Sequence, residues 1–335
     1  MIVPAYNEAD TIAETLDSLQ QQSVAACEII VVDDCSTDGT GDIARSLGAT
    51  VVRPAVNTGS KAGAQNVALG LVKTPFVVAV DADTTLAPDA LERLLTAFDR
   101  DDVVAACGFV VPRIVNSIWE RGRYIEYLFA FSFYKQIQDY YGKPVIASGC
   151  FSIYRTQALR AAGGWSTQTL AEDMDLTWTF YRAGCAIRFV PDAVCYPIEP
   201  HTHDHLRAQL QRWSHGFVQN VRLHWQGLLE VPFLRSAVAV AVWDASIASV
   251  AYLLALPLLA LVLGSLWPLL GYVIDAPAIL IPVLVAAKRR RETWKALTSL
   301  PAFFVLRAVN AVFFIRALWL EVAMKRPLLV YEKGH

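Results

Sequence analysis

The sequence predicts an α/β protein whose N-terminal part forms a parallel sheet with crossover helices and whose C-terminal part forms apolar helices. Over the first hundred residues short apolar runs alternate with helix-like stretches, and from Ser236 onward Ala, Val, Leu, Ile and Trp dominate. The chain of 335 residues is 55% hydrophobic and 18% charged, which is too apolar for an average soluble domain. We therefore expect a cytosolic domain over residues 1–226 and a membrane domain over residues 227–335, with an interface helix and two to three transmembrane helices.

The N-terminal elements follow one another as in a parallel sheet whose strands are connected by helices. Asn7 or Asp10 lies near the start of the first helix, and Pro88 has the position preferred in a first helical turn. The expected strands are residues 2–5, 28–32, 50–53 and 76–80, and the expected helices are residues 9–21, 39–47, 61–71 and 89–98.

The second half of the predicted cytosolic domain begins with a less regular stretch. Beyond it, residues 145–154 are typical of a strand that Ser148-Gly149-Cys150 interrupts. We then expect a helix over residues 172–183, a strand over residues 186–190 and an amphipathic helix over residues 206–225.

Three apolar segments are candidates for membrane spans. Residues 236–264 and 266–287 are each long enough to cross roughly 30 Å of hydrocarbon, which takes about 20 residues. Residues 297–324 are a weaker candidate, because Arg307 and Arg316 interrupt them and a charge at bilayer depth is costly unless it faces protein. We expect two full spans and favour a third.

Charged residues in this part bear on the topology. The Lys-Arg-Arg-Arg run at residues 288–291 suits a cytoplasmic loop under the positive-inside rule. Three spans place Lys325-Arg326 outside, whereas a last segment along the membrane interface leaves both basic segments in the cytoplasm. Asp244 either faces the helix bundle or marks a later start of the first span. We expect a multi-pass membrane protein, in the plasma or inner membrane if the source is bacterial.

Charge and cysteine content limit the classes of protein. The net charge of −2 argues against a nucleic-acid binder, which normally carries a basic surface. The six cysteines include no C-x-x-C pair, which is typical of reduced thiols in the cytosol. Residues 1–4 lead directly into polar, turn-like residues, so we expect no signal peptide.

Acidic residues directly follow two of the predicted strands. Asp33-Asp34 ends the second strand, and Asp81-Ala82-Asp83 follows the fourth. Open α/β sheets bind their ligands at the carboxyl ends of the strands. Carboxylates spaced as in Asp81 and Asp83 suit Mg²⁺ or Mn²⁺ bridged to a diphosphate, although a D-x-D alone is also compatible with a capping loop.

Seven short motifs follow one another along the predicted cytosolic domain. They are Val3-Pro4-Ala5-Tyr6-Asn7-Glu8, Val32-Asp33-Asp34-Cys35-Ser36, Gly59-Ser60-Lys61-Ala62-Gly63-Ala64-Gln65-Asn66, Asp81-Ala82-Asp83, Ser148-Gly149-Cys150, Glu172-Asp173 and Gln209-Leu210-Gln211-Arg212-Trp213. In order and spacing they resemble the motifs of family 2 glycosyltransferases. The most similar branch is the membrane-embedded one with Q-x-x-R-W, which includes cellulose, chitin, hyaluronan and poly-N-acetylglucosamine synthases.

The resemblance implies a GT-A fold that binds a nucleotide-sugar donor together with Mg²⁺ or Mn²⁺. Tyr6 and Glu8 are expected to contact the nucleoside, Asp33 and Asp34 the base and ribose, and Lys61 the base or diphosphate. Turn, capping and solvated positions are the alternatives for these residues. Pro4, Asp81, Gly149, Cys150 and Glu172 complete the expected donor-binding set, and Asp81 and Asp83 are the expected metal ligands.

The same resemblance assigns the acceptor side. Asp173 is the expected general base of an inverting transfer, because one carboxylate has to take the proton of the attacking hydroxyl. An acidic pair at a helix N-terminus is the alternative, which Asp175 keeps open. Gln209, Arg212 and Trp213 share one helical face, where Trp213 would stack on the acceptor sugar and Arg212 would reach the diphosphate.

Several questions stay open at this level. His201, His203 and His205 alternate as metal ligands on a strand do, but the resemblance places them in a loop without metal. The leading hypothesis is extension of a β-linked polysaccharide from a UDP-sugar. A single addition to a lipid acceptor, such as a ceramide or polyprenyl-linked one, is the alternative, and a non-enzymatic scaffold is a third. An oligomer or partner subunit would complete a secretion channel.

Overall fold

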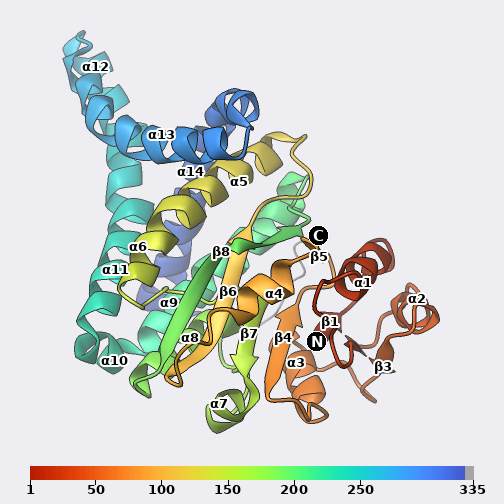
Figure 1. Ribbon diagram of the computed structural model, residues 1–335. Helices are drawn as coiled ribbons and strands as arrows, with labels where there is room; N and C mark the ends of the chain where they lie inside the picture. The colour runs from red at the N-terminus through yellow and green to blue at the C-terminus, as the bar shows by residue number, and fades with distance from the viewer. Residues whose placement is uncertain (329–335) are drawn as a thin grey trace.

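The protein is described by a computed structural model that covers residues 1–328, without the side chains of residues 274 and 275. Its centre is an eight-stranded sheet in the order β3-β2-β1-β4-β7-β6-β8-β5 (Figure 1). The strands are β1 (Ile2–Ala5), β2 (Ile30–Asp33), β3 (Thr50–Val52), β4 (Phe76–Val80), β5 (Thr84–Leu86), β6 (Val103–Val110), β7 (Phe151–Arg155) and β8 (Ala186–Pro197).

Helices connect and cover the strands, and they form the C-terminal part alone. In the α/β part they are α1 (Ile12–Gln20), α2 (Thr40–Ser46), α3 (Lys61–Leu69), α4 (Ala90–Leu95), α5 (Ile118–Phe129), α6 (Lys135–Tyr140), α7 (Thr156–Ala161), α8 (Glu172–Arg182) and α9 (His203–Leu223). They continue as α10 (Trp225–Glu230), α11 (Pro232–Val242), α12 (Leu256–Leu263), α13 (Tyr272–Arg289) and α14 (Thr293–Leu318). The π-helical and 3-10 turns are η1 (Ala130–Tyr134), η2 (Trp243–Ala248), η3 (Ala251–Ala255), η4 (Trp267–Gly271) and η5 (Trp319–Ala323).

The predicted parallel sheet with crossover helices forms the N-terminal half. Strands β3, β2, β1 and β4 are parallel, and α1, α2 and α3 connect them in chain order. Strand β7 then runs antiparallel to both β4 and β6. The ends of β1, β2 and β4 therefore meet at one edge, where loops carrying acidic residues follow them.

Two elements in the stretch that looked irregular in the sequence are central to the fold. All eight residues of β6 are buried, as in a strand covered on both faces. Helix α5 begins with a capping box: the Ser117 hydroxyl accepts a hydrogen bond from the Glu120 amide, and the Glu120 carboxylate accepts one from the Ser117 amide. Together β6 and α5 carry the sheet toward the C-terminal helices.

The local predictions had mixed outcomes. The N-cap of α1 is Thr11, next to Asp10, which was expected near the start of this helix; Asn7 lies one turn earlier and adopts a positive φ of 54°. Pro88 precedes the N-cap of α4, Asp89, and so lies outside the helix. Strand β7 begins only after the Ser148-Gly149-Cys150 segment, which forms part of the loop before it.

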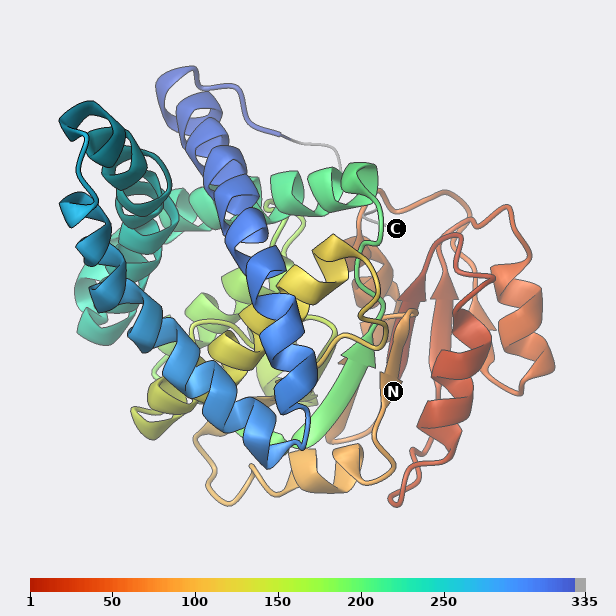
Figure 2. The same ribbon diagram turned by 90° about the horizontal axis from the view of Figure 1, so that it is seen from above.

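The C-terminal helices gather on the side of the sheet away from β1–β3 (Figure 1). Helix α14 crosses α5 and also packs against α9 (Figure 2). Within the described residues, two helical segments are long and apolar enough to cross a membrane: Pro232–Leu263 and Thr293–Ala323. The first overlaps the predicted span 236–264, and the second overlaps the segment 297–324 that had seemed weaker. Residues 266–287 fold as η4 and most of α13.

Candidate active site

Lys61 lies at the centre of the residues that the motifs single out. It is the first residue of α3, whose N-cap Ser60 accepts a hydrogen bond from the amide of Gly63. Its ammonium forms an ion pair with Asp81 in the loop after β4, lies 3.7 Å from the Glu172 carboxylate and donates to the carbonyl of Gly149 over 3.1 Å. One cation thus joins segments that lie far apart in the chain.

Asp173 faces the same place and is held by backbone donors. The Gly149 amide donates to its Oδ2 over 2.7 Å, and the Met174 amide donates to its Oδ1 over 2.8 Å. Burial raises the pKa of Asp173, while Lys61 and the two amide hydrogen bonds oppose this rise. The nearby Asp81 charge raises this pKa further. Asp173 is therefore a fixed carboxylate with an elevated proton affinity.

Gly149 has no room for a side chain. A Cβ added to it would lie 2.9 Å from Asp173 Oδ2 and 3.1 Å from Lys61 Nζ. The glycine thus lets the backbone approach both charged groups, and its amide and carbonyl bind one of them each.

Glu172 completes this acidic group. Burial raises its pKa, and Asp173 raises it further, whereas Lys61 and Arg212 lower it. Because Arg212 acts on Glu172, the Q-x-x-R-W helix reaches the same cluster. The structure therefore brings Lys61, Asp81, Gly149, Glu172 and Asp173 together, and their roles in binding and catalysis remain predictions.

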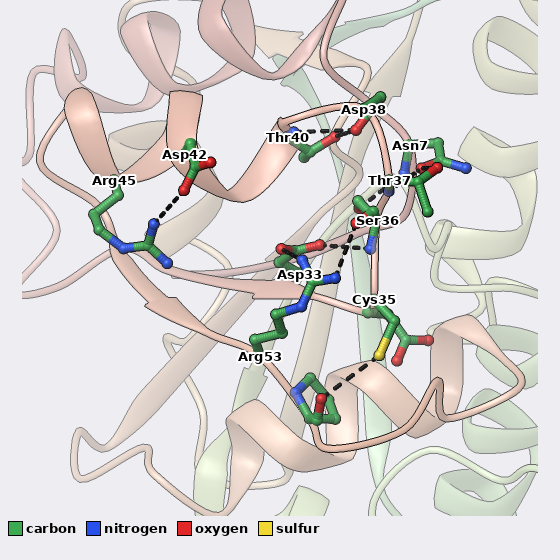
Figure 3. A network of polar contacts seen from close by, with 12 residues as sticks. Asn7, Asp33, Cys35, Ser36, Thr37, Asp38, Thr40, Asp42, Arg45 and Arg53 are labelled. Carbon is green, nitrogen blue, oxygen red and sulfur yellow. Dashed lines mark hydrogen bonds and ion pairs between the residues drawn. The ribbon is translucent and has the colours of Figure 1, made fainter.

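The residues expected at the nucleoside lie at the ends of β1 and β2. Asp33 is buried, forms an ion pair with Arg53 and accepts from the Ser36 amide over 2.9 Å (Figure 3). Asp34 accepts from the amide and the hydroxyl of Thr58, both over 2.8 Å. Both carboxylates thus hold neighbouring loops in place, and contact of either with a nucleoside stays a prediction.

The first motif forms the loop between β1 and α1. Pro4 lies within β1 beside Val32, and Tyr6 is 44% exposed and so accessible for stacking. Glu8 is buried and accepts from the hydroxyl of Thr11 over 2.9 Å. Roles for Pro4, Tyr6 and Glu8 in binding a nucleotide remain predictions.

The expected metal ligands lie on the loop between β4 and β5. Asp83 is buried, and its Oδ1 accepts from the Thr84 hydroxyl over 3.0 Å. The Asp81 amide donates to the carbonyl of Cys150 over 3.2 Å, which fixes this loop beside β7. Within residues 1–328, His, Cys, Asp and Glu form no group of three or more that would hold a metal by themselves. Two aspartates nevertheless suit Mg²⁺ or Mn²⁺ when substrate phosphates supply further oxygen ligands.

A buried arginine organises the Q-x-x-R-W helix α9. Arg123 in α5 donates to Gln209 Oε1 over 2.9 Å, and its guanidinium carbon lies 4.5 Å from the centre of the Trp213 ring. Trp213 is 38% exposed, so one part of its ring stays accessible. The amide of Gln209 is thus used inside the protein, whereas Trp213 is available to a ligand.

Glu199, which the sequence analysis missed, belongs to the same group. It is buried, accepts from the Tyr127 hydroxyl over 2.8 Å, and lies 3.6 Å from the Arg123 guanidinium. Burial raises the pKa of Glu199 to about 7, against the opposing effect of Arg123. The charge of Asp83 raises this pKa as well, so Glu199 lies near both α9 and the loop between β4 and β5.

Other polar groups have structural explanations. Thr202 is the N-cap of α9, which places His203 and His205 in its first turn, so the alternating strand-like arrangement that suggested metal ligands does not form. Asp175 lies 2.6 Å from His224 Nε2, which anchors α8 to the end of α9. All six cysteines are free.

Comparisons with known proteins agree with this site. Residues 1–163 match the family described as glycosyl transferase family 2. A poly-beta-1,6-N-acetyl-D-glucosamine synthase of Staphylococcus epidermidis is 30% identical over 221 residues, covering 64% of this chain and 53% of the relative. The synthase of Staphylococcus aureus strain MSSA476 shows the same identity and coverage. The chain spans about half the length of these curated relatives.

The fold has a counterpart among solved structures. A mannosyltransferase from Pyrobaculum calidifontis, in complex with GDP-Man and Mn²⁺, matches 97% of this chain and 85% of its own with a TM-score of 0.62 and 22% identity. The fold is accordingly the GT-A glycosyltransferase fold, and the likeness includes most of the C-terminal helices. From these matches, residues 1–163 belong to glycosyl transferase family 2, and the chain is similar to poly-beta-1,6-N-acetyl-D-glucosamine synthases.

Proposed function

We propose that this chain transfers a sugar from a UDP-sugar to a hydroxyl acceptor with inversion, and that it extends a β-linked polysaccharide of N-acetylglucosamine. The observation that carries this proposal is the position of Asp173, whose carboxylate two backbone amides fix beside Lys61 and Asp81. The kind of sugar and product rests on the relatives, which are N-acetylglucosamine polymer synthases.

Asp173 acts as the general base in this proposal. An inverting transfer needs a carboxylate that takes the proton of the acceptor hydroxyl while that oxygen attacks the anomeric carbon. The raised pKa of Asp173 makes it a stronger proton acceptor than an exposed aspartate. Lys61 and Arg212 supply positive charge where the leaving diphosphate gains negative charge.

Asp81 and Asp83 would hold Mg²⁺ or Mn²⁺ together with the donor diphosphate. Their oxygen ligands and their place on the loop between β4 and β5 fit a hard divalent cation shared with phosphates. When bound, such a cation stabilises the charge that develops on the departing nucleotide. Lys61 keeps Asp81 in position through their ion pair.

Trp213 would bind the acceptor sugar by stacking. The Arg123 guanidinium lies against its ring from the protein side, and 38% of the side chain stays exposed. Exposed tryptophan rings commonly present an apolar face to partners while their polar edge stays wet. The acceptor hydroxyl would then lie between Trp213 and Asp173.

We also propose that the protein is a membrane protein whose catalytic domain is cytosolic. In the most apolar part of Pro232–Leu263 only 11% of the residues are buried, so this helix needs lipid or another apolar partner. The Arg307 guanidinium binds the Asp244 carboxylate over 2.9 Å. Residues 245–263 beyond this pair carry no charge and are long enough for one crossing.

Contacts with the catalytic domain support one of the two topologies that the basic segments left open. Just before α14, Arg290 lies 5.3 Å from the Phe109 ring, and Glu292 accepts from the Tyr124 hydroxyl over 3.1 Å. At the other end, Glu321 contacts α9. Because both ends of α14 contact the catalytic domain, a single crossing by α14 is incompatible with these contacts. We therefore propose that the predicted spans 236–264 and 266–287 make two crossings before α14, and that α14 lies along the interface.

A panel of donors with mass analysis of the products tests the proposed reaction. The purified protein in lipid is incubated with Mn²⁺, acceptor and UDP-N-acetylglucosamine, UDP-glucose, UDP-glucuronate or GDP-mannose. We expect a polymer from UDP-N-acetylglucosamine. A glycolipid that carries one sugar would contradict polymer extension and support a single addition to a lipid acceptor. The absence of any product would contradict sugar transfer itself.

A further inference from the structure

The short segment before Asp173 is held by helix α9 as well as by its own helix α8, in which the Asp175 amide donates to the Ala171 carbonyl over 3.1 Å. The Leu170 amide donates to Gln219 Oε1 over 3.1 Å, and the Ala171 carbonyl accepts from Asn220 Nδ2 over 2.9 Å. We call Thr169–Leu170–Ala171 the base loop, because Glu172 and Asp173 follow it directly. The position of Asp173 therefore depends on side chains of α9.

Close backbone contact strengthens this dependence. The Thr169 hydroxyl donates to the carbonyl of Gly216 over 3.4 Å. A Cβ at Gly216 would lie 2.7 Å from Ala171 Cβ and 2.8 Å from the Ala171 amide nitrogen. The base loop thus lies directly on α9, and any movement of α9 at this point moves the loop with it.

A buried carboxylate from the end of the last apolar helix holds the same turn of α9. Glu321 in η5 is 1% exposed, and its Oε1 lies 2.7 Å from His215 Nδ1 and 2.9 Å from Gln219 Nε2. Arg222 lies 3.5 Å from its Oε2. The Leu328 amide also donates to Oε1 of Glu321, over 3.2 Å. The carboxylate is thus removed from water, and most of its partners are side chains of α9.

Glu321 also fixes which way the Gln219 amide points. An amide group carries its donors on nitrogen and its acceptor on oxygen. Because Glu321 and the carbonyl of Leu328 both accept from Gln219 Nε2, the oxygen of Gln219 faces Leu170. A reversed amide would direct its N–H group at the Leu170 amide and its oxygen at a carboxylate, and both contacts would be repulsive.

From this chain of contacts we propose that Glu321 is a positioning residue for catalysis: through Gln219 it holds the base loop and hence Asp173 in place. The proposal rests on the proposed function, in which Asp173 is the general base. It links turnover to the position of the apolar segment Thr293–Ala323, because Glu321 lies near the C-terminal end of that segment. Donor binding, which the proposed function places at Lys61 and Asp81, does not depend on this link.

Glu321→Leu tests the proposal, with Ser299→Ala as a control at a buried polar position of the preceding helix α14. Initial rates are measured in lipid nanodiscs against donor concentration, and UDP binding is measured by calorimetry. We expect kcat to fall by about 100-fold, as for a displaced catalytic group, with the donor KM and the Kd of UDP unchanged. Glu321→Gln, which keeps an acceptor oxygen for Gln219, should retain most of the turnover.

Two further results complete the test. Gln219→Leu should lower kcat by a similar factor, and combining it with Glu321→Leu should produce little further loss, because both act through one contact. Gln219→Leu also tests the base loop if Glu321→Leu does not fold. An unchanged kcat in a folded Glu321→Leu protein, or a matching rise in the Kd of UDP, would overturn the proposal. If Asp173→Asn is inactive while Glu321→Leu is fully active, only the positioning role fails; if Asp173→Asn is fully active, the proposed function fails.

Discussion

Replacing Gly149 by alanine perturbs the proposed catalytic carboxylate without removing any charge. The new Cβ would lie 2.9 Å from Asp173 Oδ2, whereas ordinary contacts of this kind begin at 3.4 Å. The carboxylate therefore has to move by about half an ångström or lose its hydrogen bond to the residue 149 amide. Gly149 does not have a positive φ, so alanine adds no backbone strain.

The size of the effect follows from this displacement. Misplacing a catalytic group by about 1 Å lowers rates by about 100-fold, so half of that shift predicts a 10- to 100-fold loss of kcat. This corresponds to about 1.4 to 2.7 kcal/mol of activation free energy. Gly70→Ala is the matched control, because Gly70 has a helical φ of −59° and its added Cβ would lie 3.4 Å from the Val67 carbonyl oxygen, an ordinary contact distance.

Steady-state kinetics with the active donor and thermal unfolding of both variants check this reasoning. We expect Gly149→Ala to keep its unfolding temperature within a few degrees and to lose kcat, and Gly70→Ala to keep both. Full kcat in Gly149→Ala would refute the tight contact between Asp173 and residue 149. A loss of activity that only follows unfolding would refute the catalytic explanation of that contact.

Three further predictions concern the groups around this carboxylate. Folding raises the pKa of Glu199 from 4.5 to about 7, so between these pH values the folded chain holds more protons than the unfolded chain. The contribution of Glu199 to the free energy of unfolding therefore falls as the pH rises through this window. Glu199→Gln should flatten the dependence of the unfolding temperature on pH there. Arg123→Met should raise the acceptor KM more than the donor KM, because it removes the guanidinium that packs on Trp213 and binds Gln209, and equal changes in both would contradict this role. Chelation by EDTA should abolish turnover and added Mn²⁺ should restore it, whereas turnover that persists in EDTA would exclude metal binding by Asp81 and Asp83 as a requirement.

The N-terminal half of the fold was predictable because its signals are local. Short apolar runs that alternate with helix-like stretches identified β1 and β4 with their observed bounds and the crossover helices within a few residues. Strand β6 and helix α5 were missed for different reasons. The apolar run of β6 contains Cys107 and Gly108, which blurred its strand pattern, and α5 mixes charged with aromatic residues. The capping box at Ser117 and Glu120 was the available signal for α5.

The candidate site also contains residues that the sequence identified and contacts that it did not. The motifs identified Lys61, Asp81, Glu172 and Asp173, and the fold brings them to one place. The packing of Arg123 on Trp213 was not predictable. Arg123 binds Gln209 of the same helix across 86 positions in the chain, and no local pattern encodes such a pairing.

The proposed topology of the last helix rests on three-dimensional contacts, which a local sequence pattern does not encode. Composition and length make Thr293–Ala323 a candidate span, but they do not record what its two ends touch. Glu292 and Glu321 bind α5 and α9, and these contacts favour an interfacial position over a crossing. Arg307, which interrupts the apolar segment, pairs with Asp244 from the other candidate span.

The most direct test of the account is turnover of Asp173→Asn beside its affinity for the donor nucleotide. Asparagine keeps the shape of the side chain and an oxygen that accepts from the Gly149 amide, but it does not take up the proton of an acceptor hydroxyl. We expect a Kd for UDP close to that of the unchanged protein and a kcat lower by at least about 100-fold, the usual contribution of a general base. A variant that turns over at the original rate would contradict a catalytic role for Asp173.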